Sequence, residues 1–196
     1  MAREPTSVPV LETPRLRLRP FKLKDAPGFH EAYGDPEAMR FWDFPAYATL
    51  AETERDVRWS MKRSPSAHGI WAVASKEGDR CIGMVNYHHR ERRNRRLEVG
   101  YILARKYWRQ GLMTEAMTAL LDYCFEKLGA HRIEALIDPE NAASIGLAKG
   151  LGFHCESGPM RDRLLVNGKF QPQVMYALVD RESLIRRHGD LPAKPQ

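Results

Sequence analysis

The chain has few cysteines and no long apolar run. Its 196 residues include only three cysteines, Cys81, Cys124 and Cys155, which stand singly and form no CxxC pair. Such spacing suggests neither a structural zinc site nor a disulfide framework, so we expect free thiols in a reducing compartment. No apolar segment approaches the roughly 18 residues that cross a membrane, and the first residues lack the charged and apolar regions of a signal peptide. We therefore expect a cytoplasmic protein with no membrane contact.

The composition is sufficient for one folded domain. With 43% hydrophobic residues, 196 residues can bury one core but are too few for two comfortable ones. We expect a single domain over residues 10–189, and disordered tails over residues 1–9 and 190–196, which are polar and contain proline. The formal net charge of +6 suits a polyanionic cofactor and would equally favour RNA.

The most informative stretch is a strand, a loop and a helix. Residues 97–103 are rich in β-branched and aromatic side chains and predict a buried or half-buried strand, whereas residues 114–128 place apolar side chains at helical spacing. Gly111 in the intervening loop allows a positive φ and a close approach of an anion to the backbone. Such a loop can bind phosphate through unpaired N–H groups and the helix dipole, with Arg109 adding charge, but most βα junctions with a glycine bind nothing.

A second strand and helix follow directly. Residues 132–137 predict a strand, residues 138–141 a turn and helix start, and residues 142–151 a helix that ends at Gly152, after which Phe153 begins another strand. Two consecutive units of this kind place their loops on the same edge of a sheet. They therefore form a cleft beyond the ends of the strands.

These segments resemble the GCN5-related N-acetyltransferase (GNAT) superfamily, and within it the branch that acetylates the N-terminal alanine or serine of ribosomal proteins. The resemblance extends from Thr13 to Tyr176, and its most specific parts are Tyr107–Ala116, Asn141–Ser144 and Gly150–Phe153. It implies an α/β (α+β) fold: a mixed, mainly antiparallel sheet of about seven strands, splayed where acetyl-CoA enters and flanked by helices. Two residues depart from the general loop pattern: Trp108 replaces Gln or Arg, and Met113 replaces a small residue.

The resemblance also assigns residues to acetyl-CoA and expects no metal. Backbone N–H groups of the loop would bind the pyrophosphate, the preceding strand would pair with the pantetheine arm, and the residues that start the second helix would contact the same arm. The residues concerned are Arg109, Gln110, Gly111, Leu112, Met113 and Thr114 in the loop, Tyr101, Ile102 and Leu103 in the strand, and Asn141 and Ser144 at the helix start.

Two residues are candidates for proton transfer. Acetyl transfer from a thioester requires a neutral amine, so a group must accept a proton. Glu98 is the candidate base, because desolvation in a partly apolar strand should raise the pKa of its carboxyl. The resemblance supports this role, since the ribosomal-protein branch carries an acidic residue at this position. The alternative is that Glu98 forms a structural ion pair with a nearby arginine. Ser144 is the candidate acid for the CoA thiolate, since Ala148 stands where many family members have a tyrosine, and N-terminal helix capping is its alternative. A backbone N–H near Leu103 would polarise the thioester carbonyl.

An aromatic cluster at residues 39–47 and a C-terminal hairpin are the candidate acceptor walls. In the family this cluster lines the acceptor groove, so Trp42 and Tyr47 would pack around the amine and Asp43 would hold its charge; ordinary packing is the alternative. The hairpin, with strands at 160–165 and 173–178 around a turn at 166–169, would form the opposite wall. Its candidate contacts are Arg161, Arg163 and Tyr176.

The remaining segments predict a framework. We expect strands over 15–20, 70–75 and 81–89, the last two joined by a turn at 77–79. We also expect a helix over 27–33 that is capped by Asp25, a short helix that starts at Asp35, and helices over 52–63 and 181–188. His88 and His89 are adjacent in a strand, so their side chains should point to opposite faces and cannot share a metal ion. The basic run 90–96 should be a hairpin tip, either solvated or in contact with ribosomal RNA or a CoA phosphate.

The sequence thus predicts an enzyme that transfers an acetyl group from acetyl-CoA to a primary amine by direct attack. The expected acceptor is the N-terminal amino group of a ribosomal protein, with ribosome association through the basic surface as an accompanying expectation. A small-molecule amine N-acetyltransferase is the first alternative, and a non-catalytic CoA-binding or RNA-associated module is the second. A homodimer is compatible with such a fold, but no stretch specifies an interface.

Overall fold

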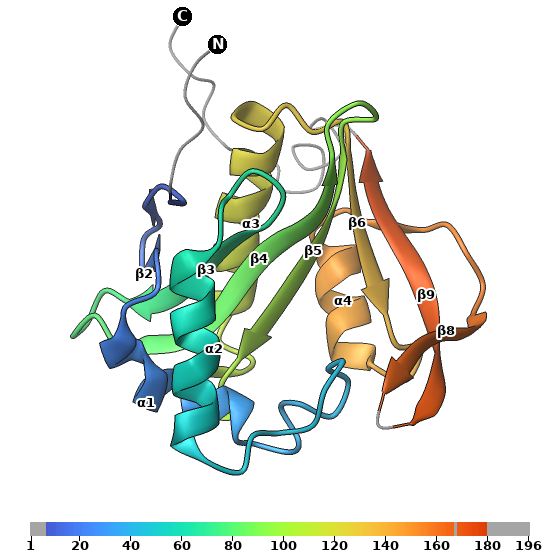
Figure 1. Cartoon of the computed structure of the whole chain (residues 1–196). Coiled ribbons are helices and arrows are strands. Elements are labelled where there is room, and N and C mark those ends of the chain that lie inside the picture. Colours follow the sequence, from blue (N-terminus) through green and yellow to red (C-terminus); the bar gives the residue numbers. More distant parts are fainter. Residues whose placement is uncertain (1–6, 167, 180–196) are drawn as a thin grey trace, which may run out of the picture.

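The computed structural model describes residues 7–166 and 168–179 (Figure 1). These residues form a nine-stranded sheet in the order β1-β2-β3-β4-β5-β6-β9-β7, with β8 paired to β9. Every pair is antiparallel except β5 with β6, so the predicted mixed, mainly antiparallel α/β fold is confirmed. The number of strands exceeds the predicted total of about seven. β1 (Leu11–Glu12) has two residues, too few to produce a periodic pattern, whereas β7 (His154–Cys155) is the short strand predicted after Gly152.

The N-terminal part of the sheet follows the predicted strands. β2 (Leu16–Arg19), β3 (Gly69–Ser75), β4 (Cys81–Glu91) and β5 (Arg96–Leu103) lie side by side in chain order. In β3 the side chains alternate between two cores, since Trp71 and Val73 belong to one cluster and Ile70 and Ala72 to the other. The sheet is therefore covered on both faces at β3, which explains why this strand is almost continuously apolar.

The splay of the sheet lies between β5 and β6 (Arg132–Ile137). Only three residue pairs join these strands, and the last is Glu98 with Glu134, although β5 continues to Leu103 and β6 to Ile137. In Figure 1 the two strands start together beside the 90–96 turn and then separate. The remaining strands, β8 (Met160–Val166) and β9 (Lys169–Val179), form the predicted hairpin, and residues 174–179 of β9 pair with all of β6.

The helices cover both faces of the sheet, as predicted. α1 (Ala26–Tyr33) and α2 (Leu50–Lys62) contribute Phe29 and Val57 to the smaller core. α3 (Leu112–Glu126) and α4 (Ala142–Gly150) pack on the larger core, to which α3 contributes Leu120 and Leu121. Two single 3-10 turns, η1 (Leu23–Asp25) and η2 (Arg105–Tyr107), complete the described elements. No helix among these residues is long and apolar enough to span a bilayer.

The end of α4 confirms the predicted glycine cap. Gly152 has φ = 93°. The Phe153 N–H donates to the Ala148 carbonyl and the Gly152 N–H to the Lys149 carbonyl, the paired bonds of a Schellman motif. Glycine is required because an L side chain is strained at this φ.

Two predictions about aspartates at helix starts are corrected by the structure. Asp25 does not cap α1 with its side chain; its carboxylate accepts from the Lys22 N–H and from Arg19, which closes η1. The helix expected from Asp35 is a run of turns, in which the Asp35 carboxylate accepts from the Glu37 N–H at 3.0 Å.

The predicted N-terminal tail ends earlier than residue 9. Val8 is buried, and the Pro9 carbonyl accepts from the Trp71 indole N–H at 2.7 Å, so these residues pack on the domain. Residues 1–6, the helix predicted at 181–188 and the tail predicted at 190–196 lie outside the described residues.

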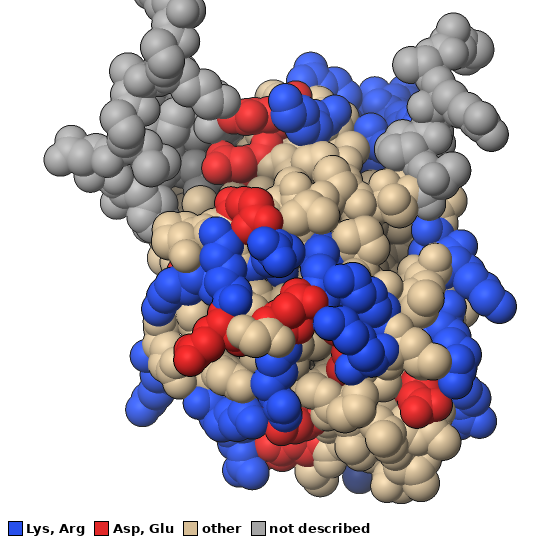
Figure 2. Space-filling view, turned by 90° about the vertical axis from the view of Figure 1, so that its left-hand side faces the viewer, with Lys and Arg blue, Asp and Glu red and all other residues tan. Residues whose placement is uncertain are grey.

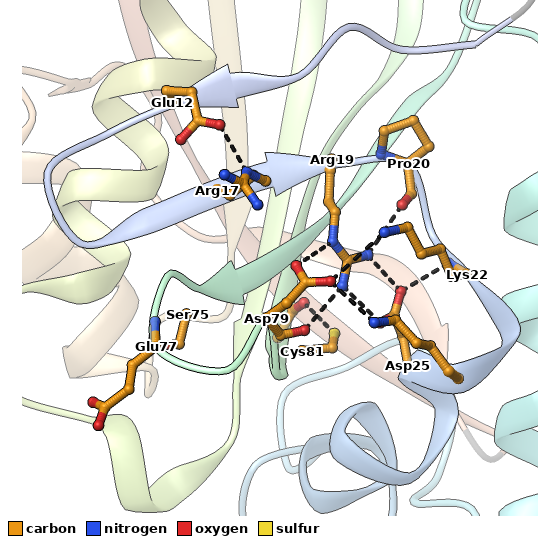
Figure 3. A network of polar contacts seen from close by, with 12 residues as sticks. Glu12, Arg17, Arg19, Pro20, Lys22, Asp25, Ser75, Glu77, Asp79 and Cys81 are labelled. Carbon is orange, nitrogen blue, oxygen red and sulfur yellow. Dashed lines mark hydrogen bonds and ion pairs between the residues drawn. The ribbon is translucent and has the colours of Figure 1, made fainter.

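A buried arginine joins three segments at the edge of the sheet (Figure 3). The Arg19 guanidinium, 3% exposed, donates twice to the Asp25 carboxylate at 2.7 and 2.8 Å, and its Nε donates to Asp79 Oδ1 at 2.8 Å. The cluster thereby ties β2 to η1 and to the β3–β4 turn. Its fully hydrogen-bonded geometry compensates the desolvation of these charges.

Outside this cluster the surface charges are mixed. Figure 2 shows the side of the molecule that carries β2, where basic side chains are interleaved with acidic ones. Exposed ion pairs there join Arg17 and Lys76 to Glu12, and Lys22 and Lys24 to Asp79. Much of the positive charge on this side is thus neutralised locally.

We predict that Asp25→Ala lowers the free energy of unfolding by about 3–5 kcal/mol, because it leaves the buried Arg19 charge without its main partner. Urea unfolding followed by circular dichroism measures the change. Glu12→Ala is the matched control: it removes an exposed partner of Arg17 and should leave the unfolding midpoint nearly unchanged. Equal losses in the two variants would contradict the structural role of the buried cluster.

Candidate active site

A large open cleft occupies the gap between β5 and β6. Its volume is about 1580 Å³. The cleft is lined by residues 98–103 of β5, the loop before α3, the end of β6 with the start of α4, the 37–44 segment, α2, and the β8–β9 hairpin. Beyond Glu98, β5 pairs with β4 on one edge and with no described strand on the other. Every second residue of β5 therefore points its backbone N–H and C=O groups into the cleft, while the residues between them point theirs toward β4. The splay thus exposes backbone hydrogen-bonding groups that a ligand can pair with.

The loop before α3 has the geometry of an anion site. Gly111 is the N-cap of α3 with φ = 73°, and Arg109 also has a positive φ, 59°. The Glu115 N–H donates to the Gly111 carbonyl at 3.0 Å, so the three preceding N–H groups, at residues 112–114, precede the first intrahelical bond. These groups and the helix dipole favour a bound anion. Arg109, Gly111, Leu112, Met113 and Thr114 line the cleft, as predicted, whereas Gln110 does not.

A clamp that the sequence analysis missed holds this loop. The Glu115 carboxylate accepts from the Thr13 hydroxyl at 2.6 Å, from the Arg15 N–H at 2.7 Å and from Arg15 Nε at 2.7 Å. Arg15 Nη1 also donates to the Gln110 carbonyl at 2.9 Å. The residues directly before β2 therefore hold the loop before α3, although the two segments lie about a hundred residues apart in the sequence.

The two unusual loop residues have structural partners. The Trp108 indole N–H donates to the Leu103 carbonyl at 2.7 Å, which fastens the loop to the free end of β5. Met113 is half-buried and packs against the larger core while also lining the cleft. Among the described residues, neither side chain accepts a hydrogen bond from an N–H group of the loop. Both residues are therefore compatible with an anion bound there.

Asn141 and Ser144 lie opposite the loop, at the start of α4. The Asn141 side-chain oxygen accepts from the Ser144 N–H at 3.0 Å, so Asn141 is the N-cap and Ser144 is not; the capping alternative for Ser144 is wrong. Both residues line the cleft together with Tyr101, Ile102 and Leu103. Tyr101 donates to the Ser144 carbonyl at 3.4 Å, and burial raises the pKa of its phenol.

These residues fit acetyl-CoA. The N–H groups at the start of α3 suit the pyrophosphate, and Gly111 leaves no Cβ in its way. The open side of β5 suits the amide groups of the pantetheine arm, and the Asn141 amide N–H₂ is not used by the helix cap.

Glu98 lies at the point where β5 and β6 separate. Its side chain is 17% exposed and lines the cleft. His88 Nε2 lies 3.5 Å from Glu98 Oε2, and His89 Nδ1 lies 3.2 Å from Glu98 Oε1. The hydrogen bond from His88 and the charges of both rings hold the pKa of the Glu98 carboxyl below its ordinary value, although burial alone would raise it. The expected upward shift is therefore wrong, and Glu98 is ionised at neutral pH.

The expectation that His88 and His89 point to opposite faces is also wrong. The pairing of β4 with β5 is irregular after His88, which pairs with Glu98, and His89 has φ = 49°. This bulge turns His89 back, so that both rings reach Glu98 and lie 4.8 Å apart. Adjacent residues can thus share a face where the pleat is interrupted.

A polar chain supports His88 from behind. Its Nδ1 lies 3.4 Å from Asn86 Oδ1, and Asn86 Nδ2 lies 3.5 Å from His68 Nε2. Burial lowers the pKa of His68 to about 4, so its neutral ring can accept from the Asn86 amide. Gly100, opposite Asn86 in β5, makes room for this amide, because a Cβ there would lie 2.7 Å from Asn86 Oδ1.

The predicted acceptor residues separate into two groups. Trp42 and Asp43 line the cleft. Tyr47 is not among the lining residues; its ring stacks on Phe44 and meets the edge of Tyr33. Tyr176 is 4% exposed and packs in the larger core. In the hairpin, Arg163 lines the cleft and Arg161 does not.

Asp56 of α2 is a cleft residue that the sequence analysis missed. It is half-buried and has no hydrogen bond or ion pair to any residue that the structure describes. Burial, with the nearby charge of Asp43 in addition, raises the pKa of its carboxyl. Trp59 on the same helix also faces the cleft. An amphipathic helix pattern marks Asp56 as polar but gives no sign that it faces a cleft.

The basic 90–96 segment forms a hairpin tip, as predicted, and several of its arginines bind the protein itself. Arg90 donates to the carbonyls of Ser66 and Leu128, and Arg95 donates to the Gly129 carbonyl. Arg96 forms ion pairs with Glu91 and Glu134. These bonds anchor the tip to the domain. Contact with RNA stays a prediction.

Comparison with known proteins identifies the family. A family model described as an acetyltransferase (GNAT) domain matches residues 15–154. The uncharacterized N-acetyltransferase p20 of Bacillus licheniformis is 32% identical over 173 residues, 88% of this chain and 97% of that protein. A Bacillus subtilis protein provisionally named a ribosomal N-acetyltransferase is 35% identical over 115 residues, 59% of this chain and 62% of that protein.

A solved structure shares the fold. Spermidine N-acetyltransferase from Vibrio cholerae, in complex with CoA and spermine, is 22% identical and has a TM-score of 0.73, over 87% of this chain and 99% of that chain. The family match includes Glu98, the loop before α3 and the start of α4. The chain thus belongs to the GNAT family of acetyl-CoA-dependent N-acetyltransferases.

Proposed function

We propose that this N-acetyltransferase acts on the N-terminal amino group of a protein, with a ribosomal protein as the expected acceptor. The observation that carries the proposal is the open acceptor side of the cleft, which is bordered by the 37–44 segment, α2 and the β8–β9 hairpin in a total volume of about 1580 Å³. Such a volume leaves room for the end of a polypeptide beside the pantetheine arm. The name of the Bacillus subtilis relative supports the same acceptor class.

Glu98 is the proposed proton acceptor. As an ionised carboxylate in the cleft it attracts the ammonium group of the acceptor and takes one proton from it, which leaves the amine lone pair free. The nitrogen then attacks the thioester carbonyl carbon, a C–N bond forms, and the C–S bond breaks as the CoA thiolate leaves. A backbone N–H on the open side of β5, near Leu103, would stabilise the oxyanion between these steps.

Ser144 is the proposed proton donor to the thiolate. Its position at the start of α4 lines the same cleft, and its capping alternative is excluded by the Asn141 side chain. A CoA thiolate is a tolerable leaving group, so this contribution is smaller than that of Glu98.

A small polyamine is the second candidate acceptor, and Asp56 favours it. A half-buried carboxylate without a partner among the described residues, beside Asp43 and the aromatic rings of Trp42 and Trp59, suits a second cationic group. The fold is shared with a spermidine N-acetyltransferase. Ribosome association, homodimerisation and the cytoplasmic location stay predictions.

The deciding experiment measures transfer of labelled acetyl from acetyl-CoA to stripped ribosomal proteins and, in parallel, to a panel of small amines. We expect label on a protein N-terminus. The Glu98→Gln variant should lose about 100-fold or more in kcat, because it removes the proton acceptor, while CoA binding by calorimetry is retained. Glu140→Gln, an exposed carboxylate at the edge of the same cleft, is the control and should transfer normally.

Each other outcome has a definite meaning. Label on small amines alone would refute the protein acceptor and keep the chemistry. Normal turnover by Glu98→Gln would remove Glu98 from the mechanism. CoA binding without any acetylated product would favour the non-catalytic module.

We predict that Ser144→Ala lowers kcat but by less than Glu98→Gln, since the thiolate can leave without a proton. Stopped assays with the best acceptor of the previous experiment measure kcat, and thermal unfolding checks that the midpoint is unchanged, as expected for a residue that does not cap α4. An unaltered kcat would assign Ser144 to cofactor contact only.

We predict that Asp56→Asn separates the two acceptor classes. If the carboxylate binds a second cationic group, the variant raises KM for spermidine at least about tenfold, the effect of losing one charge-assisted bond of roughly 1.4 kcal/mol or more, and leaves kcat little changed. Glu54→Gln on the opposite side of α2, already paired with Arg58, is the control. Equal KM values for wild type and Asp56→Asn would exclude Asp56 from polyamine recognition.

A further inference from the structure

We infer that His88, His89 and Glu98 form a binding site for a divalent transition-metal ion of the Zn²⁺ class, and that a bound ion switches acetyl transfer off. The three side chains come from neighbouring strands and offer two imidazole nitrogens and a carboxylate oxygen, all within 4.8 Å of one another. Imidazole and carboxylate ligands together suit Zn²⁺ better than Mg²⁺ or Ca²⁺, which prefer oxygen alone.

The separations are close to those of a tetrahedral site. With metal–ligand bonds of about 2.0–2.2 Å, adjacent ligand atoms lie roughly 3.3–3.5 Å apart. His88 Nε2 lies 3.5 Å from Glu98 Oε2 and His89 Nδ1 lies 3.2 Å from Glu98 Oε1, so each imidazole is near the tetrahedral distance from a carboxylate oxygen, although the two oxygens differ. The three ligand atoms lie within 4.8 Å of one another, so binding one ion through a single Glu98 oxygen requires a further approach. His89 can supply it by side-chain rotation, because its side chain is 73% exposed.

Neighbouring side chains orient His88, the less exposed of the two histidines. Histidines that bind metals usually donate their other ring N–H to a neighbouring acceptor, which directs the lone pair of the first nitrogen at the ion. His88 has such an acceptor: Nδ1 lies 3.4 Å from Asn86 Oδ1, and Asn86 is itself held by His68. The bare backbone of Gly100 leaves space for the Asn86 amide. This support leaves His88 Nε2 facing Glu98.

The site has an open side. Glu98, His88 and His89 all line the cleft, so a fourth position at the ion is accessible to water or to an incoming amine. Three protein ligands and an open position make a site that exchanges its ion, unlike a closed four-ligand structural site. It should respond to the free metal concentration and to chelators.

The inhibitory half of the inference rests on the proposed function of Glu98. A carboxylate whose lone pair is donated to a metal cannot accept a proton from the acceptor ammonium. The cation also repels that ammonium from the cleft. Metal binding itself is independent of this role, so the two halves are tested by separate measurements.

The binding test is calorimetric titration of the full chain, without a histidine tag, with Zn²⁺ and with Mg²⁺. We expect one Zn²⁺ per chain and no Mg²⁺. His89→Ala should weaken the affinity for Zn²⁺ by more than about tenfold, since removal of even supporting groups at metal sites costs 10–100-fold. His154→Ala removes an exposed histidine of β7 and should bind as wild type does.

Circular dichroism melting checks that His89→Ala is folded, as we expect because the His89 side chain is largely exposed. Absence of Zn²⁺ binding by wild type, or equal affinity of wild type and His89→Ala, overturns the metal site.

The inhibition test adds Zn²⁺ to wild type during acetyl transfer and then EDTA. We expect loss of activity at the concentration that fills the calorimetric site, and recovery with EDTA. Full activity with the site filled overturns the switch. If wild type binds Zn²⁺ but acetylates no acceptor, the proposed function fails and the metal site is supported; if it acetylates but binds no Zn²⁺, the metal site fails and the proposed function is supported.

Discussion

The end of the β5–β6 ladder at Glu98 and Glu134 is the constraint on which the rest of the structure depends. Parallel strands that stay paired would leave no unpaired backbone between them and no gap beyond it. Because pairing stops after three residues, one edge of β5 is free, α3 and α4 start on either side of the opening, and Glu98 lies where it begins. The proposed cofactor site, the access for an acceptor and the position of the proposed base all depend on this single interruption.

The electrostatics of the opening follow from what β4 contributes. Glu98 would be a half-buried carboxylate of raised pKa if it faced only apolar neighbours. The irregular end of β4 brings two imidazoles to it and reverses the direction of the shift. A carboxylate that is ionised at neutral pH attracts cations of either kind, so the feature that would serve a cationic acceptor in the proposed mechanism would also favour the proposed metal ion.

The sequence predicted the parts of this site that depend on local pattern. The strand at 97–103, the helix start after Gly111 and the glycine cap at Gly152 each depend on a few neighbouring residues, and the loop motif could be compared with a family. The prediction failed where a side chain depends on a distant partner. Asp25 is bound by Arg19, Glu98 is shifted by His88, and Tyr176 is directed into the core by its register on β9, which pairs it with Ala135. His89 was misplaced because a bulge breaks the two-residue period on which the argument relied.

The clamp between Arg15 and Glu115 gives the N-terminal strand a second role. β2 is an outer part of the sheet, yet Arg15, directly before it, holds the loop before α3 through the Gln110 carbonyl. The cleft is consequently assembled from all three thirds of the chain, and its loop before α3 is not held before β2 has docked. A nascent chain that has already formed the β5–α3 unit would still lack a rigid phosphate loop if its N-terminus were held away, so cofactor binding reports on the docking of the N-terminus as much as on the motif itself.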